Sequence, residues 1–163
     1  FVNNSGFFLN NEMDDFSSKP GSPNTYGLIG SQANSIEPGK RMLSSMTPSI
    51  LEKNDNLFLV LGSPGGSTII TSVLQTILNV ILFDMSIQHA VDNKRFHHQW
   101  KPEYIYMEKN LASDSIIKSL QNMGHYVKER NSIGHVNAIM FDKNTISIGV
   151  DKRGDNSGEI LNN

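Results

Sequence analysis

The chain has 163 residues, the usual size of one domain and enough to bury a hydrophobic core. Its formal net charge of -2 at pH 7 argues against a nucleic-acid or membrane-surface partner. Cysteine is absent, which excludes disulfides, thiolate catalysis and cysteine-ligated zinc. No apolar run is long enough to span a bilayer, and no signal peptide is visible. Because the sequence begins with Phe1, we expect a piece of a longer precursor or a truncated form.

The first third of the chain alternates short apolar runs with polar segments. Residues 1–2 and 6–9 are apolar and predict strands, the second of them buried, leading into the polar cluster at residues 10–15. Residues 17–40 are rich in Ser, Pro, Gly and Asn and predict a long loop. A loop of this length inside a compact domain is usually functional or disordered. Tyr26 is its one large aromatic residue, and we therefore expect a lid.

The rest of the chain predicts helices interleaved with hairpins. Strands are expected at residues 47–51, 57–61, 104–108, from 127, at 135–141 and at 145–150, with turns at residues 54–56 and 142–144. Helices are expected at residues 67–83, 86–91 and 113–123. This mixture predicts a layered α+β fold. We predict a single domain over residues 1–163, with a mobile tail at residues 154–163.

A glycine-rich turn joins the strand at residues 57–61 to the helix that begins near Ser67. At such a turn the backbone N–H groups of Gly65 and Gly66 are free donors, and the helix dipole adds positive potential. The absence of side chains lets a phosphate, carboxylate or oxyanion come close to these donors. The turn is not a P-loop, because no Gly-Lys-Ser/Thr follows at the required spacing. A tight turn without function is the alternative.

Two polar pairs precede this turn. Glu12 and Asp15 could form a solvated turn, an acid/base pair as in sugar hydrolysis, or a clasp for an ammonium group. Ser44 and Ser45 could be a loop pair, yet together with the carboxylates and the glycine turn they indicate a site for a small zwitterion. We expect no metal site and no cofactor, since the adjacent His97-His98 point to opposite faces of a strand and have structural roles.

Six motifs in this order resemble the small subunit of gamma-glutamyltranspeptidases, also called glutathione hydrolases. They are Asn-Asn-Glu-Met-Asp-Asp-Phe at residues 10–16, Lys-Pro-Gly at 19–21, Pro-Asn-Thr-Tyr-Gly-Leu at 23–28, Lys-Arg-Met-Leu-Ser-Ser-Met-Thr-Pro at 40–48, Gly-Ser-Pro-Gly-Gly at 62–66 and Arg-Phe-His-His-Gln-Trp at 95–100. The resemblance extends from about residue 6 to residue 153 and is highly specific. It implies an N-terminal-nucleophile (Ntn) hydrolase with a four-layer α-β-β-α sandwich, of which this chain is part.

The resemblance also implies a mechanism and a set of roles. A precursor cuts itself into a large and a small subunit, and the new N-terminal Thr attacks a gamma-glutamyl amide with its own amine as base. The acyl group then passes to water, an amino acid or a peptide. By motif match, the α-ammonium binds Glu12 and Asp15, the α-carboxylate binds Ser44 and Ser45, the oxyanion hole is Gly65 and Gly66, and Tyr26 belongs to the lid. The implied partners are the large subunit and gamma-glutamyl compounds such as glutathione.

The sequence departs from the family pattern in ways that affect the functional prediction. The Thr-Thr-His start with the nucleophile is absent, as is the large-subunit arginine, and we expect this chain to be inactive alone. Asp151-Lys152-Arg153 resembles the family's closing Asp-Pro-Arg loosely. The alternatives are a non-catalytic relative that binds glutamyl compounds or packs against a partner, and a poly-gamma-glutamate depolymerase. The loop at residues 20–27 favours the transpeptidase. The resemblance implies a periplasmic or secreted location.

Overall fold

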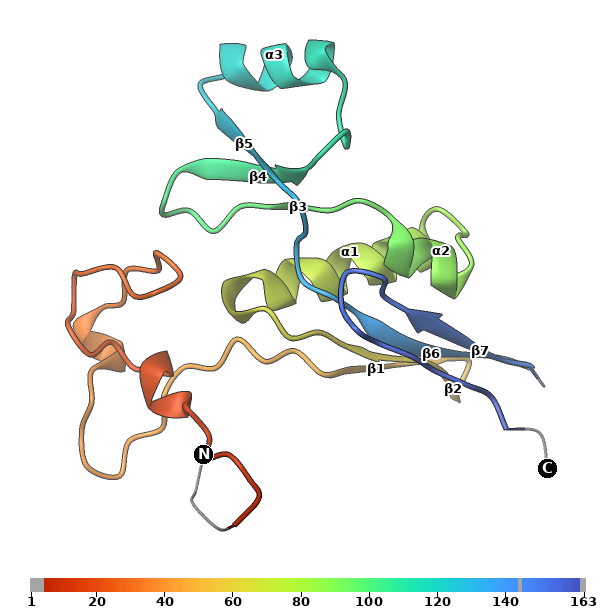
Figure 1. Cartoon of the computed structure of the whole chain (residues 1–163), viewed down its shortest axis with the longest axis horizontal. Coiled ribbons are helices and arrows are strands. Elements are labelled where there is room, and N and C mark those ends of the chain that lie inside the picture. Colours follow the sequence, from red (N-terminus) through yellow and green to blue (C-terminus); the bar gives the residue numbers. More distant parts are fainter. Residues whose placement is uncertain (1–4, 144, 162–163) are drawn as a thin grey trace. The chain divides into compact units, whose positions relative to one another are not determined.

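The computed structural model describes residues 5–143 and 145–161 and divides into two compact units, residues 1–44 and residues 45–163 (Figure 1). The predicted strand at residues 1–2 and the turn residue Asn144 lie outside the described residues. Two compact units within one chain do not fix a domain boundary, so the single domain stays a prediction.

The first unit is built from turns around a buried Phe16. Its regular elements are two short 3-10 helices, η1 (Glu12–Asp15) and η2 (Gln32–Asn34). The Asn34 side chain holds the unit together, because its amide donates to the Asp15 carbonyl at 2.7 Å and accepts the Leu43 N–H at 2.9 Å. Residues 17–40 are therefore a loop, as predicted, and one that is folded back on itself.

The predicted buried strand at residues 6–9 is wrong. No strand pairing between described residues includes this segment, and the side chains of Phe7, Phe8 and Leu9 are exposed. An apolar run indicates a tendency to be buried, but a strand also requires neighbouring backbone groups for its N–H and C=O groups. Hydrophobic pattern alone could not supply that information.

The second unit is organised around a four-stranded antiparallel sheet. Its strand order is β1 (Ser49–Lys53), β2 (Asn56–Gly62), β6 (Asn137–Asp142) and β7 (Thr145–Val150). Asn54 and Asp55 have φ of 53° and 62° and form the two-residue turn between β1 and β2. Both predicted hairpins are confirmed, although β1 and β6 each begin two residues later than expected.

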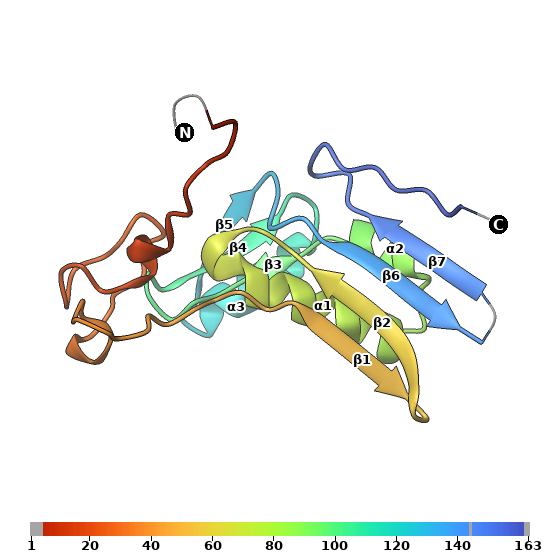
Figure 2. The ribbon, with the colours of Figure 1, turned by 90° about the horizontal axis from the view of Figure 1, so that it is seen from below.

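Two helices cover one face of this sheet, α1 (Ile69–Ile81) and α2 (Ile87–Asp92) (Figures 1 and 2). Leu59 and Leu61 of β2 face these helices and form the core together with Val73, Val80, Ile87, Ala90, Val91, Val136 and Ala138. Ser86 caps α2 as predicted, since its hydroxyl accepts the His89 N–H at 3.4 Å. The core thus fixes where α1 begins relative to the end of β2.

A smaller sheet follows, with the order β3 (Phe96–His97), β4 (Tyr104–Glu108) and β5 (Tyr126–Arg130). β4 and β5 are parallel, and α3 (Asp114–Asn122) connects them, so the α+β prediction is confirmed.

None of the helices within the described residues has the length and hydrophobicity needed to cross a bilayer. A Cβ at Gly158 would lie 3.0 Å from Ile148 and Val150, so the tail runs close to β7. The mobility of residues 154–163 stays a prediction.

Candidate functional site

The glycine turn lies between the end of β2 and the start of α1. Gly65 and Gly66 have φ of 138° and 56°, and both values favour glycine strongly. A short 3-10 turn, η3 (Gly66–Thr68), leads directly into α1. Neither the Gly65 nor the Gly66 N–H donates a hydrogen bond to any described part of the chain. Two open donors at a helix start can bind an anion or a developing oxyanion.

The predicted carboxylate pair lies on one turn of the first unit. Glu12 and Asp15 begin and end η1, and both side chains are exposed. The position of Asp15 is fixed through its backbone, whose carbonyl accepts the Asn34 amide. Two exposed carboxylates on one 3-10 turn can accept hydrogen bonds from an ammonium group, and they are equally compatible with a solvated turn.

Tyr26 lies at the tip of a tight turn within the predicted lid. The Asn24 side chain accepts the N–H groups of Tyr26 and Leu28 at 2.9 and 3.0 Å, and the Asn24 N–H donates to the Leu28 carbonyl at 2.9 Å. The Tyr26 side chain is 54% exposed. The hydrogen bonds of Asn24 therefore build the turn that carries Tyr26.

The predicted site is divided between the two units. Glu12, Asp15, Tyr26 and Ser44 belong to the first unit, whereas Ser45, Gly65 and Gly66 belong to the second. Ser44 is exposed and Ser45 half-buried, in an extended segment with no regular structure. The structure thus brings Glu12 together with Asp15, and Gly65 together with Gly66. The roles of all seven residues stay predictions.

The sequence did not predict a network of four charged residues, three of which, Arg95, Glu108 and Asp151, are buried. Arg95 and Asp151 are 1% and 0% exposed, and the Arg95 Nη1 to Asp151 Oδ2 distance is 2.8 Å. Arg153 pairs with both Asp151 and Glu108. These residues lie on separate segments of the chain, so no local spacing identifies them. The Asp-x-Arg at residues 151–153 is a local signal for this network, and it resembles the family's closing Asp-Pro-Arg only loosely.

Hydrogen bonds keep both carboxylates of this network ionised. Burial alone would raise the pKa of Asp151, but hydrogen bonds from the Arg153 and Val136 N–H groups and the Arg95 charge hold that pKa below its ordinary value. Burial would likewise raise the pKa of Glu108, and hydrogen bonds from Arg153 and the Ile133 N–H hold it below the ordinary value. Two carboxylates and two guanidinium groups therefore balance in charge.

The predicted structural role of the histidine pair fits the geometry of His97. His97 is the last residue of β3 and is buried, whereas His98 follows the strand and is exposed. His97 Nδ1 lies 2.8 Å from the Thr71 hydroxyl, and Nε2 lies 2.8 Å from Gln99 Oε1. Burial lowers the pKa of His97, which favours the neutral form of the ring. The ring ties α1 to β3.

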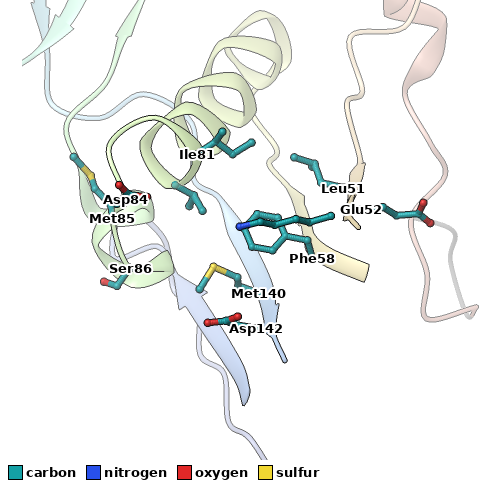
Figure 3. Close-up of a pocket in the computed structure, with 11 residues that line it drawn as sticks. Leu51, Glu52, Phe58, Ile81, Asp84, Met85, Ser86, Met140 and Asp142 are labelled. Atoms are coloured by element: carbon teal, nitrogen blue, oxygen red, sulfur yellow. The ribbon is translucent and has the colours of Figure 1, made fainter. Parts of the chain in front are cut away.

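A separate cavity lies at the other end of α1 (Figure 3). Its volume is about 620 Å³, and its apolar lining includes Leu51, Phe58 and Met140. Val80 and Ile81, near the C-terminal end of α1, also line it. The 13 residues of α1 span about 20 Å, so this cavity is well separated from the glycine turn. None of the predicted site residues lines it.

Comparison with known proteins identifies the fold and the family of this chain. The solved gamma-glutamyltranspeptidase of Pseudomonas nitroreducens, complexed with L-DON, is 42% identical with a TM-score of 0.89, covering 99% of this chain and 85% of the solved chain. The fold is therefore that of the Ntn hydrolases. The gamma-glutamyltranspeptidase family model matches residues 1–161. This chain belongs to the gamma-glutamyltranspeptidase family.

Curated relatives agree with this assignment. The glutathione hydrolase proenzyme of Escherichia coli (strain K12) is 48% identical over 136 residues, covering 83% of this chain and 23% of that protein. The glutathione hydrolase proenzyme of Pseudomonas aeruginosa is 41% identical over 163 residues, covering 98% of this chain and 29% of that protein. The chain thus spans about a quarter of the length of the curated relatives that it matches.

Proposed function

We propose that a full-length protein containing this chain cleaves gamma-glutamyl amides such as glutathione and transfers the glutamyl group to water, an amino acid or a peptide. The observation that carries this proposal is the pair of open N–H donors at Gly65 and Gly66, in a chain of this family. Attack on an amide carbonyl places negative charge on its oxygen, and pre-positioned backbone donors stabilise that charge. The nucleophile is a threonine outside this chain, acting through an acyl-enzyme.

The remaining site residues bind the glutamyl group. Glu12 and Asp15 accept hydrogen bonds from its α-ammonium, while Ser44 and Ser45 donate to its α-carboxylate. The exposure of the two carboxylates on η1 supports this assignment, because a ligand can reach both of them. Tyr26 belongs to a lid that excludes water from the bound substrate.

The partner is the large subunit of the same precursor, with which the four-layer sandwich is completed. One face of the four-stranded sheet is covered by α1 and α2 (Figure 2). The strand register places a row of apolar residues on the other face. Ile50, Val60, Ile139 and Ile148 are paired in register across β1, β2, β6 and β7 on that second face. Ile50 and Ile139 are 71% and 41% exposed. Such a row fits a second sheet packed face to face.

The glutamyl-binding role is tested by Asp15→Ala in the full-length protein, with Asp14→Ala as the matched control on the same turn. Losing a hydrogen bond to a charged group weakens transition-state binding by roughly 1.5–3 kcal/mol, which lowers kcat/KM for a gamma-glutamyl anilide by about 10- to 150-fold. Asp14→Ala leaves kcat/KM within about twofold of the wild type. Equal kcat/KM values for Asp15→Ala and the wild type would mean that η1 is a solvated turn.

Two alternative functions remain, and release of the anilide and the preferred substrate distinguish them from the proposed one. A non-catalytic relative binds a glutamyl compound without releasing the anilide, and a poly-gamma-glutamate depolymerase prefers a polymer to glutathione. The family assignment and the names of the curated relatives favour glutathione and small gamma-glutamyl compounds. A periplasmic or secreted location is part of this proposal and is tested by fractionation of cells that produce the full-length protein.

A further inference from the structure

The peptide plane between Pro64 and Gly65 is fixed by a side chain. The Ser63 hydroxyl donates to the Pro64 carbonyl at 2.7 Å and accepts the His135 N–H at 3.2 Å. Because a peptide unit is planar, the Pro64 C=O and the Gly65 N–H belong to one rigid plane and point in opposite directions. The hydroxyl that holds the carbonyl therefore also sets the direction of the Gly65 N–H.

The next peptide plane is fixed in the same way from the other side of the turn. The Thr68 hydroxyl donates to the Gly65 carbonyl at 2.9 Å, and the Thr68 N–H donates to the same carbonyl at 3.1 Å. That carbonyl shares a peptide plane with the Gly66 N–H. A Cβ built on Gly65 would lie 2.6 Å from the Thr68 hydroxyl, so the hydroxyl is packed directly against the glycine.

We propose that Ser63 and Thr68 are positioning residues that orient the Gly65 and Gly66 N–H groups toward the oxyanion, and this rests on the function proposed above. Glycine has no side chain to resist rotation of its neighbouring peptide planes, so an oxyanion site made of two glycines needs its orientation fixed by other groups. Electrostatic stabilisation of a transition state depends on donors that are already oriented before the reaction. The two hydroxyls provide this orientation without contacting the substrate.

Ser63 is itself held by residues 133–136, hereafter the 133–136 loop. The flanks of this loop are bound to the buried network: the Ile133 N–H donates to Glu108 at 2.8 Å, and the Val136 N–H donates to Asp151 at 2.8 Å. Between these anchors the His135 N–H reaches Ser63. The orientation of the Gly65 N–H is therefore connected, through one hydroxyl, to the interior of the fold.

Gly134 lets the loop approach this closely. Its φ is +59°, and a Cβ there would lie 2.3 Å from the Ser72 Oγ and 3.1 Å from the Ser63 Oγ. A Cβ on Gly65 would in turn lie 3.5 Å from the Gly134 Cα. The loop thus packs backbone against backbone beside the glycine turn, which restricts movement of Ser63 further.

The competing explanation is that both hydroxyls only stabilise the turn. Serine and threonine hydroxyls commonly bond nearby backbone carbonyls, and their loss then lowers stability without changing the chemistry of the folded molecules. The two explanations differ in kcat measured per active site. Orientation of an oxyanion donor affects the transition state, whereas turn stability affects the fraction of folded protein.

The experiment uses the full-length protein and a chromogenic gamma-glutamyl anilide, with active sites titrated and the melting temperature measured for each variant. Ser63→Ala and Thr68→Val remove the hydroxyls, and Ser63→Thr and Thr68→Ser retain them. Thr76→Val is the matched control for Thr68, because its buried hydroxyl donates to the Ser72 carbonyl at 2.9 Å within α1. Ser119→Ala, whose hydroxyl donates to the Ser115 carbonyl at 2.9 Å on α3, is the control for Ser63.

Complete loss of one oxyanion donor lowers kcat by about 10²–10³-fold. Because misorientation is a partial loss, we expect Ser63→Ala to lower kcat per active site by at least about tenfold with KM within about twofold. Thr68→Val lowers kcat less, since the Thr68 N–H still holds the Gly65 carbonyl. The hydroxyl-retaining variants restore kcat, and both controls keep it. Normal kcat in Ser63→Ala and Thr68→Val overturns this inference, while a wild-type protein without turnover overturns the proposed function itself.

Discussion

The Asp151→Asn substitution tests whether the buried charged network holds the second unit together. The two carboxylate oxygens accept four hydrogen bonds: Oδ2 from Arg95 Nη1 and the Val136 N–H, and Oδ1 from the N–H and Nη1 of Arg153. Asparagine has nearly the same shape, but its amide nitrogen cannot accept a hydrogen bond. In either orientation of the Asn amide, its NH₂ group replaces one of the two carboxylate oxygens. The two donors that bonded to that oxygen then face another donor.

The magnitude follows from burial. Asp151 is 0% exposed and Arg95 is 1% exposed, so water cannot replace the lost charge. Removing one partner of such a pair typically costs about 3–5 kcal/mol, against a total stability of roughly 5–15 kcal/mol. With an m-value of about 2 kcal/mol/M, the urea midpoint of the transition that unfolds this unit falls by roughly 1.5–2.5 M.

The matched control is Asp92→Asn, in which the same chemical change occurs at a half-buried side chain whose cationic partner is exposed. Asp92 Oδ2 lies 3.0 Å from Lys152 Nζ, and the Lys152 side chain is 81% exposed. Exposed pairs contribute about 0–1 kcal/mol, so the urea midpoint changes by less than about 0.5 M. Urea unfolding of full-length protein, followed by far-UV circular dichroism, measures both variants. If Asp151→Asn shifts the midpoint no more than Asp92→Asn does, the network does not stabilise the fold as argued.

Two further predictions concern the same unit. Ser86→Ala removes the hydroxyl that accepts the His89 N–H at 3.4 Å, and we expect a loss near the low end of about 0.5–2 kcal/mol in urea unfolding, with Ser86→Asp restoring most of it. Because the pKa values of Glu108 and Asp151 are held below their ordinary values, their contribution to stability is complete above the unfolded pKa of about 4 and is lost as the pH falls through the lowered folded values. Unfolding free energies between pH 6 and pH 2 measure that loss, and a slope unchanged by Asp151→Asn would contradict it.

Local patterns in the sequence predicted most elements of the second unit. The apolar periodicity of residues 67–83, the Ser86 cap and the polar turn at residues 54–56 each depend on neighbours in the chain, and α1, α2 and the β1–β2 hairpin follow them closely. The glycine turn was predicted for the same reason, because a strand, two glycines and a helix are adjacent in the sequence. Its positive φ values agree with that prediction.

Long-range contacts could not be predicted in this way. Arg95, Glu108 and Asp151 look like ordinary surface charges in the sequence, since burial of a charge depends on partners far along the chain. The strand predicted at residues 6–9 failed for a related reason, because its apolar pattern carried no information about neighbouring strands. Sequence reasoning also treated Gly65 and Gly66 as sufficient donors, without identifying the hydroxyls of Ser63 and Thr68 that fix their peptide planes.

The 133–136 loop connects the glycine turn, which neighbouring residues in the sequence build, to the buried charged residues, which come from distant parts of the chain. The chemistry proposed for the glycine turn needs backbone donors held in one orientation, yet Gly65 is exposed and both glycines are intrinsically free to rotate. The loop connects that turn to the most deeply buried charges in the described structure through Ile133, His135 and Val136. A substitution in the network can therefore lower activity by two routes, through the folded fraction and through the orientation of Ser63. Measuring kcat per active site together with the urea midpoint for Asp151→Asn distinguishes these routes, since only the second changes the chemistry of molecules that remain folded.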